Sequence, residues 1–410
     1  MASTGVVLLL LLALAARMAL QPERSMPILL DRLGEALGLE ITATGTPELR
    51  LRGNPALVVR DVTARQPGAA RPVLHAERIL LSLPWSTVRD RGATLDLVRV
   101  ELDAPTLDLP ALRRWLATRP PGETRIPTLR DGLRVRGGRI DDIGWRVENF
   151  DGELRDLHPG RPVQADVRGR YVDGATTMPF DLVLALSTPA PPADIRLVGT
   201  LELRRPDWRM PARVELSGPL RLEDGDLHLA PARLELSADY VSGDARLPFV
   251  LGLHGPLRYR DGTWVLAPVG VAMRGRSPLP VFDAHGALAL GRRLVLRLDG
   301  TLPDWPEAWP TLPPPLGAST SALPFTLDYA GAANLSSAAR LRLQRDGARF
   351  DARFRLPDVM AWLDDGGSGT PLPPLSGSVS APHLEISGAR LEGVEIVIEE
   401  PGLPAPDATQ

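Results

Sequence analysis

The sequence predicts a mainly β protein, built as a long curled antiparallel sheet. Three observations carry this prediction: apolar and polar residues alternate along many short runs, Asp-Gly pairs recur between those runs, and helical periodicity is rare. Alternation places successive side chains on opposite faces of a strand, so each run indicates a strand with one apolar and one solvated face. With roughly six to eight residues in each strand, the chain has room for about 20 strands.

Alternation is clearest in residues 180–186, 195–204 and 294–298, where leucine fills most of every second position. A slip of one residue would turn every apolar side chain to the opposite face, so such runs fix their own register. Within residues 95–102 the apolar phase slips by one position between Leu97 and Val98. This slip predicts a bulge or a crossing at that point.

Asp-Gly pairs occur eight times, and they favour two-residue hairpin turns because both positions of a type I′ turn need a positive φ. A two-residue turn fixes which residues face each other, so the sequence itself tests the assignment. Three of the eight pairs bring apolar residues opposite apolar residues, which supports an antiparallel meander. The facing residues are Leu222 and Leu227 for Asp224, Tyr259 and Trp264 for Asp261, and Leu343 and Phe350 for Asp346.

Two segments have helical spacing. Residues Met26–Leu39 form a short amphipathic pattern that Gly38 ends, and residues Pro110–Thr118 begin with a proline that suits a first helical turn. We expect the first helix to cap the N-terminal end of the sheet.

Residues 5–16 read GVVLLLLLALAA, an uninterrupted apolar run. The run has the length of a signal-peptide core and is short for a membrane span of ~20 residues, which residues 18–20 would extend. Both interpretations predict export, with segment 1–20 either cleaved as a signal peptide or retained as a signal anchor. In the anchor, the membrane would hold Val6, Val7, Leu8, Leu9, Leu10, Leu11, Leu12 and Leu14.

Pro-rich stretches divide the rest of the chain. The largest contains Trp305 and Trp309, and we expect a loop that these two rings pin to the sheet. A position at a groove mouth or a membrane interface is the alternative for the two rings. The predicted segments are 1–20, the signal peptide or anchor; 26–118, an N-terminal cap with the first strands; 119–302, a central β-groove; 303–320, the Pro-rich loop; 321–400, a C-terminal β-groove; and 401–410, a disordered tail.

A sheet with an apolar face needs a cover, and two short helices supply little of one. Either the sheet closes on itself as a barrel or sandwich, or it forms an open hydrophobic groove that a ligand covers. A bare groove would expose more apolar surface than a soluble protein usually carries. Acyl chains suit an aliphatic lining, because burial stabilises by roughly 0.8 kcal/mol per CH₂ without directional contacts. The predicted lining is Leu182, Leu184, Leu186, Leu197, Leu201, Leu234, Leu236, Leu294, Leu296, Leu298, Leu341 and Leu343.

Composition excludes several kinds of chemistry. All 47 basic residues are arginine and cysteine is absent, which excludes lysine nucleophiles, P-loops, thiol chemistry and disulfides. The six histidines lack the spacing of metal ligands, and no nucleophile elbow is present. A net charge of −3 gives no reason to expect nucleic acid. We therefore expect a protein that is not an enzyme, with no catalytic residues, no metal site and no cofactor.

Three segments resemble the start of AsmA-family envelope proteins, a group that includes TamB-like chains. They are Leu33–Ala64 (LGEALGLEITATGTPELRLRGNPALVVRDVTA), Leu74–Val88 (LHAERILLSLPWSTV) and Leu95–Leu112 (LDLVRVELDAPTLDLPAL). The C-terminal His383–Glu400 is similar to the strand-rich ends of such proteins. The resemblance covers the first quarter of the chain well.

This resemblance implies a β-groove protein anchored in the bacterial inner membrane, with the bulk of the chain in the periplasm. It implies passive transport of phospholipid along the groove for outer-membrane lipid homeostasis, and it carries over no catalytic residues. The implied partners are phospholipid acyl chains, the inner membrane and other envelope proteins. The alternative is a periplasmic scaffold that assists outer-membrane protein assembly or secretion through exposed strand edges.

Overall fold

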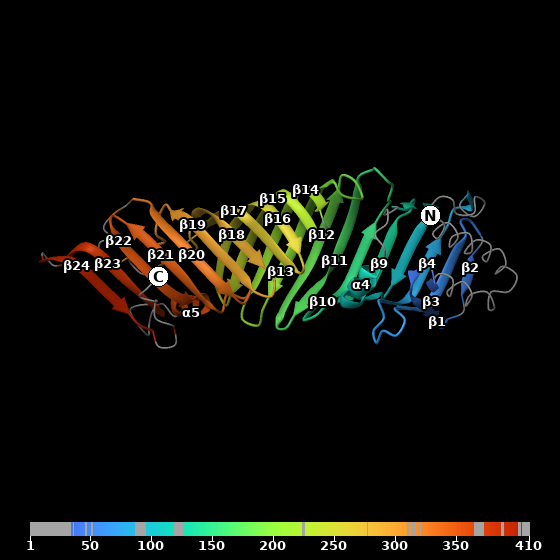
Figure 1. The fold of residues 1–410 in the computed structure, drawn as a ribbon, viewed down its shortest axis with the longest axis horizontal. Helices are drawn as coiled ribbons and strands as arrows, with labels where there is room; N and C mark the ends of the chain where they lie inside the picture. Colours follow the sequence, from blue (N-terminus) through green and yellow to red (C-terminus); the bar gives the residue numbers. More distant parts are fainter. Residues whose placement is uncertain are drawn as a thin grey trace. The chain divides into compact units, whose positions relative to one another are not determined.

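Strands dominate the protein, as the alternation predicts (Figure 1). The computed structural model describes residues 34–400, apart from 36, 46, 51, 87–95, 119–125, 224–225, 277, 310–311, 313–315, 318, 320, 365–372 and 387–388, together with Leu403. The chain divides into two compact units, residues 1–213 and 214–410. Strand β14 (Arg209–Glu223) begins in the first unit and ends in the second. The division falls inside the predicted segment 119–302.

The N-terminal unit is a mixed sheet in which consecutive strands are mostly antiparallel neighbours. The strands β10 to β13 have 10 to 12 residues each, and they form an antiparallel meander. The strands are β1 (Glu40–Ala43), β2 (Glu48–Arg50), β3 (Ala56–Arg65), β4 (Leu74–Ser82), β5 (Asp96–Leu97), β6 (Arg99–Asp103), β7 (Thr106–Asp108), β8 (Thr128–Leu129), β9 (Leu133–Asp141), β10 (Trp145–Leu154), β11 (Val163–Asp173), β12 (Thr176–Leu186) and β13 (Ala193–Arg204).

One connection departs from the predicted antiparallel arrangement: β9 runs parallel to both β6 and β7. Parallel neighbours need a crossover, and here the chain leaves β7, forms helix α4 (Leu109–Ala117) and returns as β9. The helix lies where the sequence predicts one. Its N-cap is Asp108, whose carboxylate accepts a hydrogen bond from the backbone N–H of Ala111 at 2.7 Å. The predicted slip at Val98 is the break between β5 and β6, and β5 pairs with β8 outside the main sheet.

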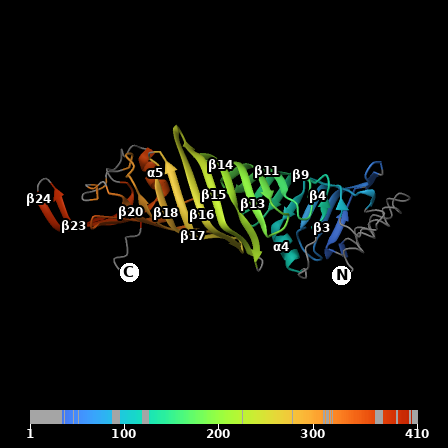
Figure 2. The same cartoon turned by 90° about the horizontal axis from the view of Figure 1, so that it is seen from above.

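Helix α4 lies against one side of the N-terminal unit's sheet (Figure 2). Its Ala111 belongs to a small core with Leu39, Ala64 and Val73. The indole N–H of Trp115 donates to the backbone oxygen of Leu37 at 2.8 Å, which ties the helix to the chain entering β1. This end of the sheet is therefore covered by the protein's own side chains.

The C-terminal unit is an antiparallel meander in which each strand pairs with the next. Helix α5 (Leu356–Asp364) lies between the strands β22 and β23 along the chain. The strands are β15 (Asp226–Ser242), β16 (Ala245–Arg260), β17 (Thr263–Gly275), β18 (Phe282–Leu290), β19 (Leu294–Leu302), β20 (Leu323–Gly331), β21 (Ala338–Arg345), β22 (Ala348–Arg355), β23 (Leu375–Ile386) and β24 (Ala389–Ile398).

Two of the three predicted Asp-Gly registers are confirmed. At both turns the Asp and the Gly have positive φ, as a type I′ turn requires: +48° and +79° at Asp261, and +49° and +82° at Asp346. Tyr259 faces Trp264 across the first turn, and Leu343 faces Phe350 across the second. The turn at Asp224 lies outside the described residues.

Several other predictions fall on residues that the structure does not describe. These include the whole segment 1–20 with its anchor residues Val6–Leu14, and most of the tail 401–410. Of the predicted helix Met26–Leu39, only Gly34, Glu35 and Leu37 are described as helical. Within the described part of the chain, no helix has both the length and the apolar character to cross a membrane.

Candidate functional site

The registers of β11, β12 and β13 gather one continuous set of apolar side chains on one face of the N-terminal unit. In β11 and β12, Ala165 faces Leu184, and in β12 and β13 Leu184 faces Leu197. Residues at every second position share a face, so the same register carries along all three strands. We call this set the N-terminal apolar face; it consists of Val163, Ala165, Val167, Phe180, Leu182, Leu184, Leu186, Ile195, Leu197 and Leu201.

All five predicted lining residues of this unit, Leu182, Leu184, Leu186, Leu197 and Leu201, therefore lie together. Each is partly exposed, and none belongs to a buried core cluster of the described residues. The small cores of this unit lie instead around β1, β3 and β4, and around helix α4. Within the described part of the chain, the leucines of the N-terminal apolar face thus lie side by side on the sheet, outside these cores and partly open to solvent.

Two glycines shape this face. A Cβ on Gly169 would lie 3.0 Å from the Phe180 ring and 3.2 Å from Val147, and a Cβ on Gly199 would lie 2.1 Å from the backbone oxygen of Asp181. Only glycine fits at position 199, where the contact is to backbone, whereas a Cβ at position 169 would require the Phe180 ring and Val147 to shift by a few tenths of an ångström. The Phe180 ring consequently lies over the β11 backbone and fills the space between neighbouring rows of side chains.

The opposite face of the same strands is charged. Glu148 accepts hydrogen bonds from Arg146 on its own strand and from Arg170 on β11, and these two guanidinium groups lower the pKa of its carboxyl to about 2. Farther along the sheet, hydrogen bonds from Arg204 and then Arg209 lower the pKa of Glu202. Ion pairs therefore occupy the second face, whereas aliphatic side chains occupy the first.

The C-terminal unit closes its corresponding face. Leu298 and Leu343 from the predicted lining are 4% and 2% exposed, because residues of the Pro-rich segment between β19 and β20 pack over them. Leu316 of that segment is fully buried, and Leu312 and Trp305 pack beside it. We call this cluster the C-terminal core. The expectation that no part of the chain covers the apolar wall is wrong for this unit.

Arg345 holds the Pro-rich segment in place. Its side chain is buried on the same face as Leu343, and one guanidinium nitrogen donates to the backbone oxygens of Leu316 at 2.8 Å and Ser319 at 2.7 Å. Buried backbone carbonyls need hydrogen-bond donors, and a loop that lies over an apolar face has no neighbouring strand to supply backbone N–H groups. Trp305 packs against the C-terminal core, and Trp309 meets the Trp305 ring edge to face at 4.8 Å, so the predicted contact with the sheet is shown for Trp305.

The other predicted lining residues of this unit differ in their surroundings. Leu296 and Leu341 are partly buried against the C-terminal core. Leu234 faces Leu253 and Leu236 faces Leu251 across β15 and β16, and Leu294 is the first residue of β19. Leu234, Leu236 and Leu294 are partly exposed. The predicted lining residues thus share a face within each unit, but only some of them are accessible.

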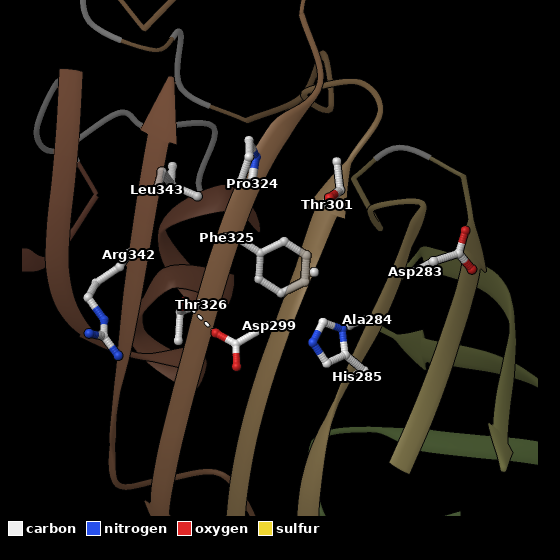
Figure 3. Close-up of a pocket in the computed structure, with 11 residues that line it drawn as sticks. Asp283, Ala284, His285, Asp299, Thr301, Pro324, Phe325, Thr326, Arg342 and Leu343 are labelled. Carbon is white, nitrogen blue, oxygen red and sulfur yellow. Dashed lines mark hydrogen bonds between the residues drawn. The ribbon is translucent and has the colours of Figure 1, made fainter. Parts of the chain in front are cut away.

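A separate hollow of about 470 Å³ lies over β18 to β21 of the C-terminal unit (Figure 3). Most of its lining side chains, including His285, Asp299 and Arg342, lie on the charged face by register. Asp299 accepts a hydrogen bond from Thr326 at 2.7 Å, and Arg342 pairs with Asp328. The second carboxylate of the lining, Asp283, pairs with Arg274 on the neighbouring strand at 2.7 Å, so both carboxylates are engaged as cross-strand partners. Across the described residues, no three His, Asp or Glu side chains gather closely enough to hold a metal ion.

Sequence reasoning missed the covering role of the Pro-rich segment and of Arg345. The signal was present in the two leucines that flank the prolines of LPPPLG, Leu312 and Leu316, which a solvated loop would not need. An arginine at an apolar position, Arg345 at the end of an alternating strand, was the second signal.

The chain matches no protein-family model, no curated protein and no solved structure in these comparisons. The resemblance to AsmA-family proteins therefore stays a prediction.

Proposed function

We propose that this protein binds phospholipid acyl chains on the N-terminal apolar face and carries them passively along it. The observation that supports this proposal is the continuous aliphatic surface over β11, β12 and β13, whose five leucines are partly exposed and lie outside the buried core clusters of the described residues. Its lining is leucine, valine, isoleucine and alanine with a single aromatic ring, Phe180, and such side chains suit acyl chains rather than sugars or nucleotides.

The strength of such binding follows from the area that a ligand would cover. Each buried methylene contributes roughly 0.8 kcal/mol, so eight methylenes of one acyl chain would contribute about 6 kcal/mol. Apolar contacts have no preferred direction, so a chain can shift along the face without losing a specific bond. Head groups would stay in water at the open side, and no cofactor would be needed.

In this proposal, the apolar segment 5–16 holds the protein in the inner membrane and the two β units lie in the periplasm. The support is the length of the apolar run and the resemblance of residues 33–112 to AsmA-family proteins. The protein would act in lipid transport towards the outer membrane and would not be an enzyme.

The test compares two double variants that differ only in which face they change. Leu184→Asp with Leu197→Asp places two carboxylates on the N-terminal apolar face, at positions that face each other. Val183→Asp with Val198→Asp is the matched control, because these residues also face each other on the same strands but on the opposite face. Phospholipid per chain is measured by mass spectrometry after purification.

We expect the first variant to lose most of its bound phospholipid and the control to keep it. Both variants contain the same apolar segment 5–16, so phospholipid bound to that segment adds equally to the two measured amounts and does not affect their difference. A second measurement uses the unchanged protein: phospholipid with a diazirine in its acyl chain should label peptides of β11 to β13. Equal lipid content in both variants, or labelling confined to residues 1–20, would overturn the proposal.

One observation favours the scaffold alternative. β24 pairs only with β23 among the described residues, so its other edge keeps free backbone groups, and its Val397 is exposed. Such an edge can accept a strand from another protein. A photo-crosslinker at Val397 would then capture an outer-membrane barrel protein, while one at the exposed Ile143 of the N-terminal unit would not.

A further inference from the structure

The strand ends around the turns at 261–262 and 291–293 of the C-terminal unit are apolar on both faces. On one face, Trp264 lies between Tyr259 and Leu290 in register. On the other face, an apolar row runs across four strands through Val265, Ala289, Val295 and Ala330, and it ends at Arg258, which faces Val265. Elsewhere on this second face the rows carry charges, as in the row of Arg297, Asp328 and Arg340.

These side chains are open to solvent. Trp264 and Leu290 are each 39% exposed, Val265 is 36% exposed and Val295 is 47% exposed. We call these four residues the strand-end patch. A protein partner that packs flat on a sheet would cover one face and leave the other bare. Apolar surroundings that enclose the strand ends from both sides would cover both faces at once.

Arginines border the strand-end patch. Arg292 and Arg293 lie in the turn between β18 and β19, and the Arg293 side chain donates to the backbone oxygen of Ala330 at 2.9 Å. No carboxylate of the described residues forms an ion pair with either of them. Arg260 is different, because it lies 3.6 Å from Asp226 and 3.7 Å from Asp261. Arg292 and Arg293 therefore place two positive charges beside the strand-end patch, and neither has an acidic partner among the described residues.

The rings add a third feature. Tyr259 and Trp264 pack at 4.6 Å between ring centres, next to the arginines. Amphipathic rings beside apolar side chains favour the boundary between lipid head groups and acyl chains. Arginines bordering such rings would meet the phosphates of the head groups.

We propose that the strand-end patch rests in the surface of an anionic phospholipid bilayer. Trp264, Val265, Leu290 and Val295 enter the head-group boundary, and Arg292 and Arg293 bind phosphate groups around them. This contact is independent of acyl-chain binding on the N-terminal apolar face, so either proposal can fail without the other.

The experiment uses the absence of native cysteine, which makes one introduced thiol the only labelled position. Val295→Cys labels the strand-end patch. Val281→Cys is the matched control: Val281 is 39% exposed, and it precedes β18 at the opposite end of the same strands. The full chain carries a fluorophore at either position and is reconstituted with vesicles that contain spin-labelled phospholipid. The vesicles are phosphatidylcholine alone or phosphatidylcholine with phosphatidylglycerol.

We expect the spin labels to quench the fluorophore at position 295 more than the one at 281, and more strongly with phosphatidylglycerol present. Arg292→Gln with Arg293→Gln should lower the ratio of membrane-bound to free strand ends about 30-fold, since each arginine near an anionic surface contributes roughly a factor of five. Both positions share one chain and one apolar segment 5–16, so the difference between them reports the patch. Equal quenching at positions 295 and 281 would overturn the proposal. So would quenching at position 295 that stays the same when phosphatidylglycerol is left out or when the two arginines are replaced.

Discussion

Single charged residues on the hydrated face of the N-terminal unit control each other's ionisation, and Glu148 shows this best. Hydrogen bonds from Arg146 first and Arg170 second lower its pKa from 4.5 to about 2. The lowered pKa means that the ion pairs favour the folded state above pH 4.5, and that this contribution is lost as the pH falls towards 2. We predict that a carbon-13 NMR titration of the glutamate carboxyls finds Glu148 still ionised at pH 3.

The matched test removes one donor. Arg170→Gln should raise the pKa of Glu148 towards its ordinary value, because one guanidinium group is gone and Arg146 remains. The pKa of Glu153, which Arg134 lowers, should stay the same in this variant. A pKa for Glu148 that is unchanged by Arg170→Gln would contradict the cross-strand pairing between β10 and β11.

At the scale of elements, the Pro-rich segment is a structural part of the C-terminal core. Leu316 is fully buried there, so Leu316→Ala should lower the free energy of unfolding by about 3 kcal/mol, within the usual range of 2 to 5 kcal/mol for a buried leucine. Urea unfolding measures the change. Val295→Ala, at an exposed position, is the control and should change the stability by less than about 0.5 kcal/mol. Equal effects of the two variants would mean that the segment does not pack on the sheet in solution.

The same segment shows where prediction from sequence succeeds and where it stops. Strands and registers could be predicted, because alternation and Asp-Gly turns are local signals; the pairing of Tyr259 with Trp264 follows from them alone. The shared face of Leu184 and Leu197 could be predicted for the same reason. The burial of Leu298 could not, because it depends on a segment that folds back over the strand it follows, which no local period encodes. The parallel step from β7 to β9 is likewise a non-local choice, although its helix could be predicted.

At the scale of the whole molecule, the chain contains one apolar face that its own residues cover and one that they leave partly open. Ligand binding stabilises the segments that it contacts, and it slows amide hydrogen exchange there by mass action. Bound phospholipid should therefore protect the amides of β11, β12 and β13 in the N-terminal unit. It should leave β19, β20 and β21 unchanged, because the Pro-rich segment already covers their apolar side chains.

Hydrogen exchange read by mass spectrometry on the full chain, with and without added phospholipid, measures this difference. At a phospholipid concentration 100 times the dissociation constant, mass action contributes about 2.7 kcal/mol, so protected amides that exchange only through the unbound state should slow about 100-fold. Peptides around residues 177–186 report the open face, and peptides around residues 294–302 report the covered one. Protection of the second set alone would mean that lipid displaces the Pro-rich segment, which would place the binding face in the C-terminal unit. Protection of neither set would leave acyl chains without a binding surface on these strands.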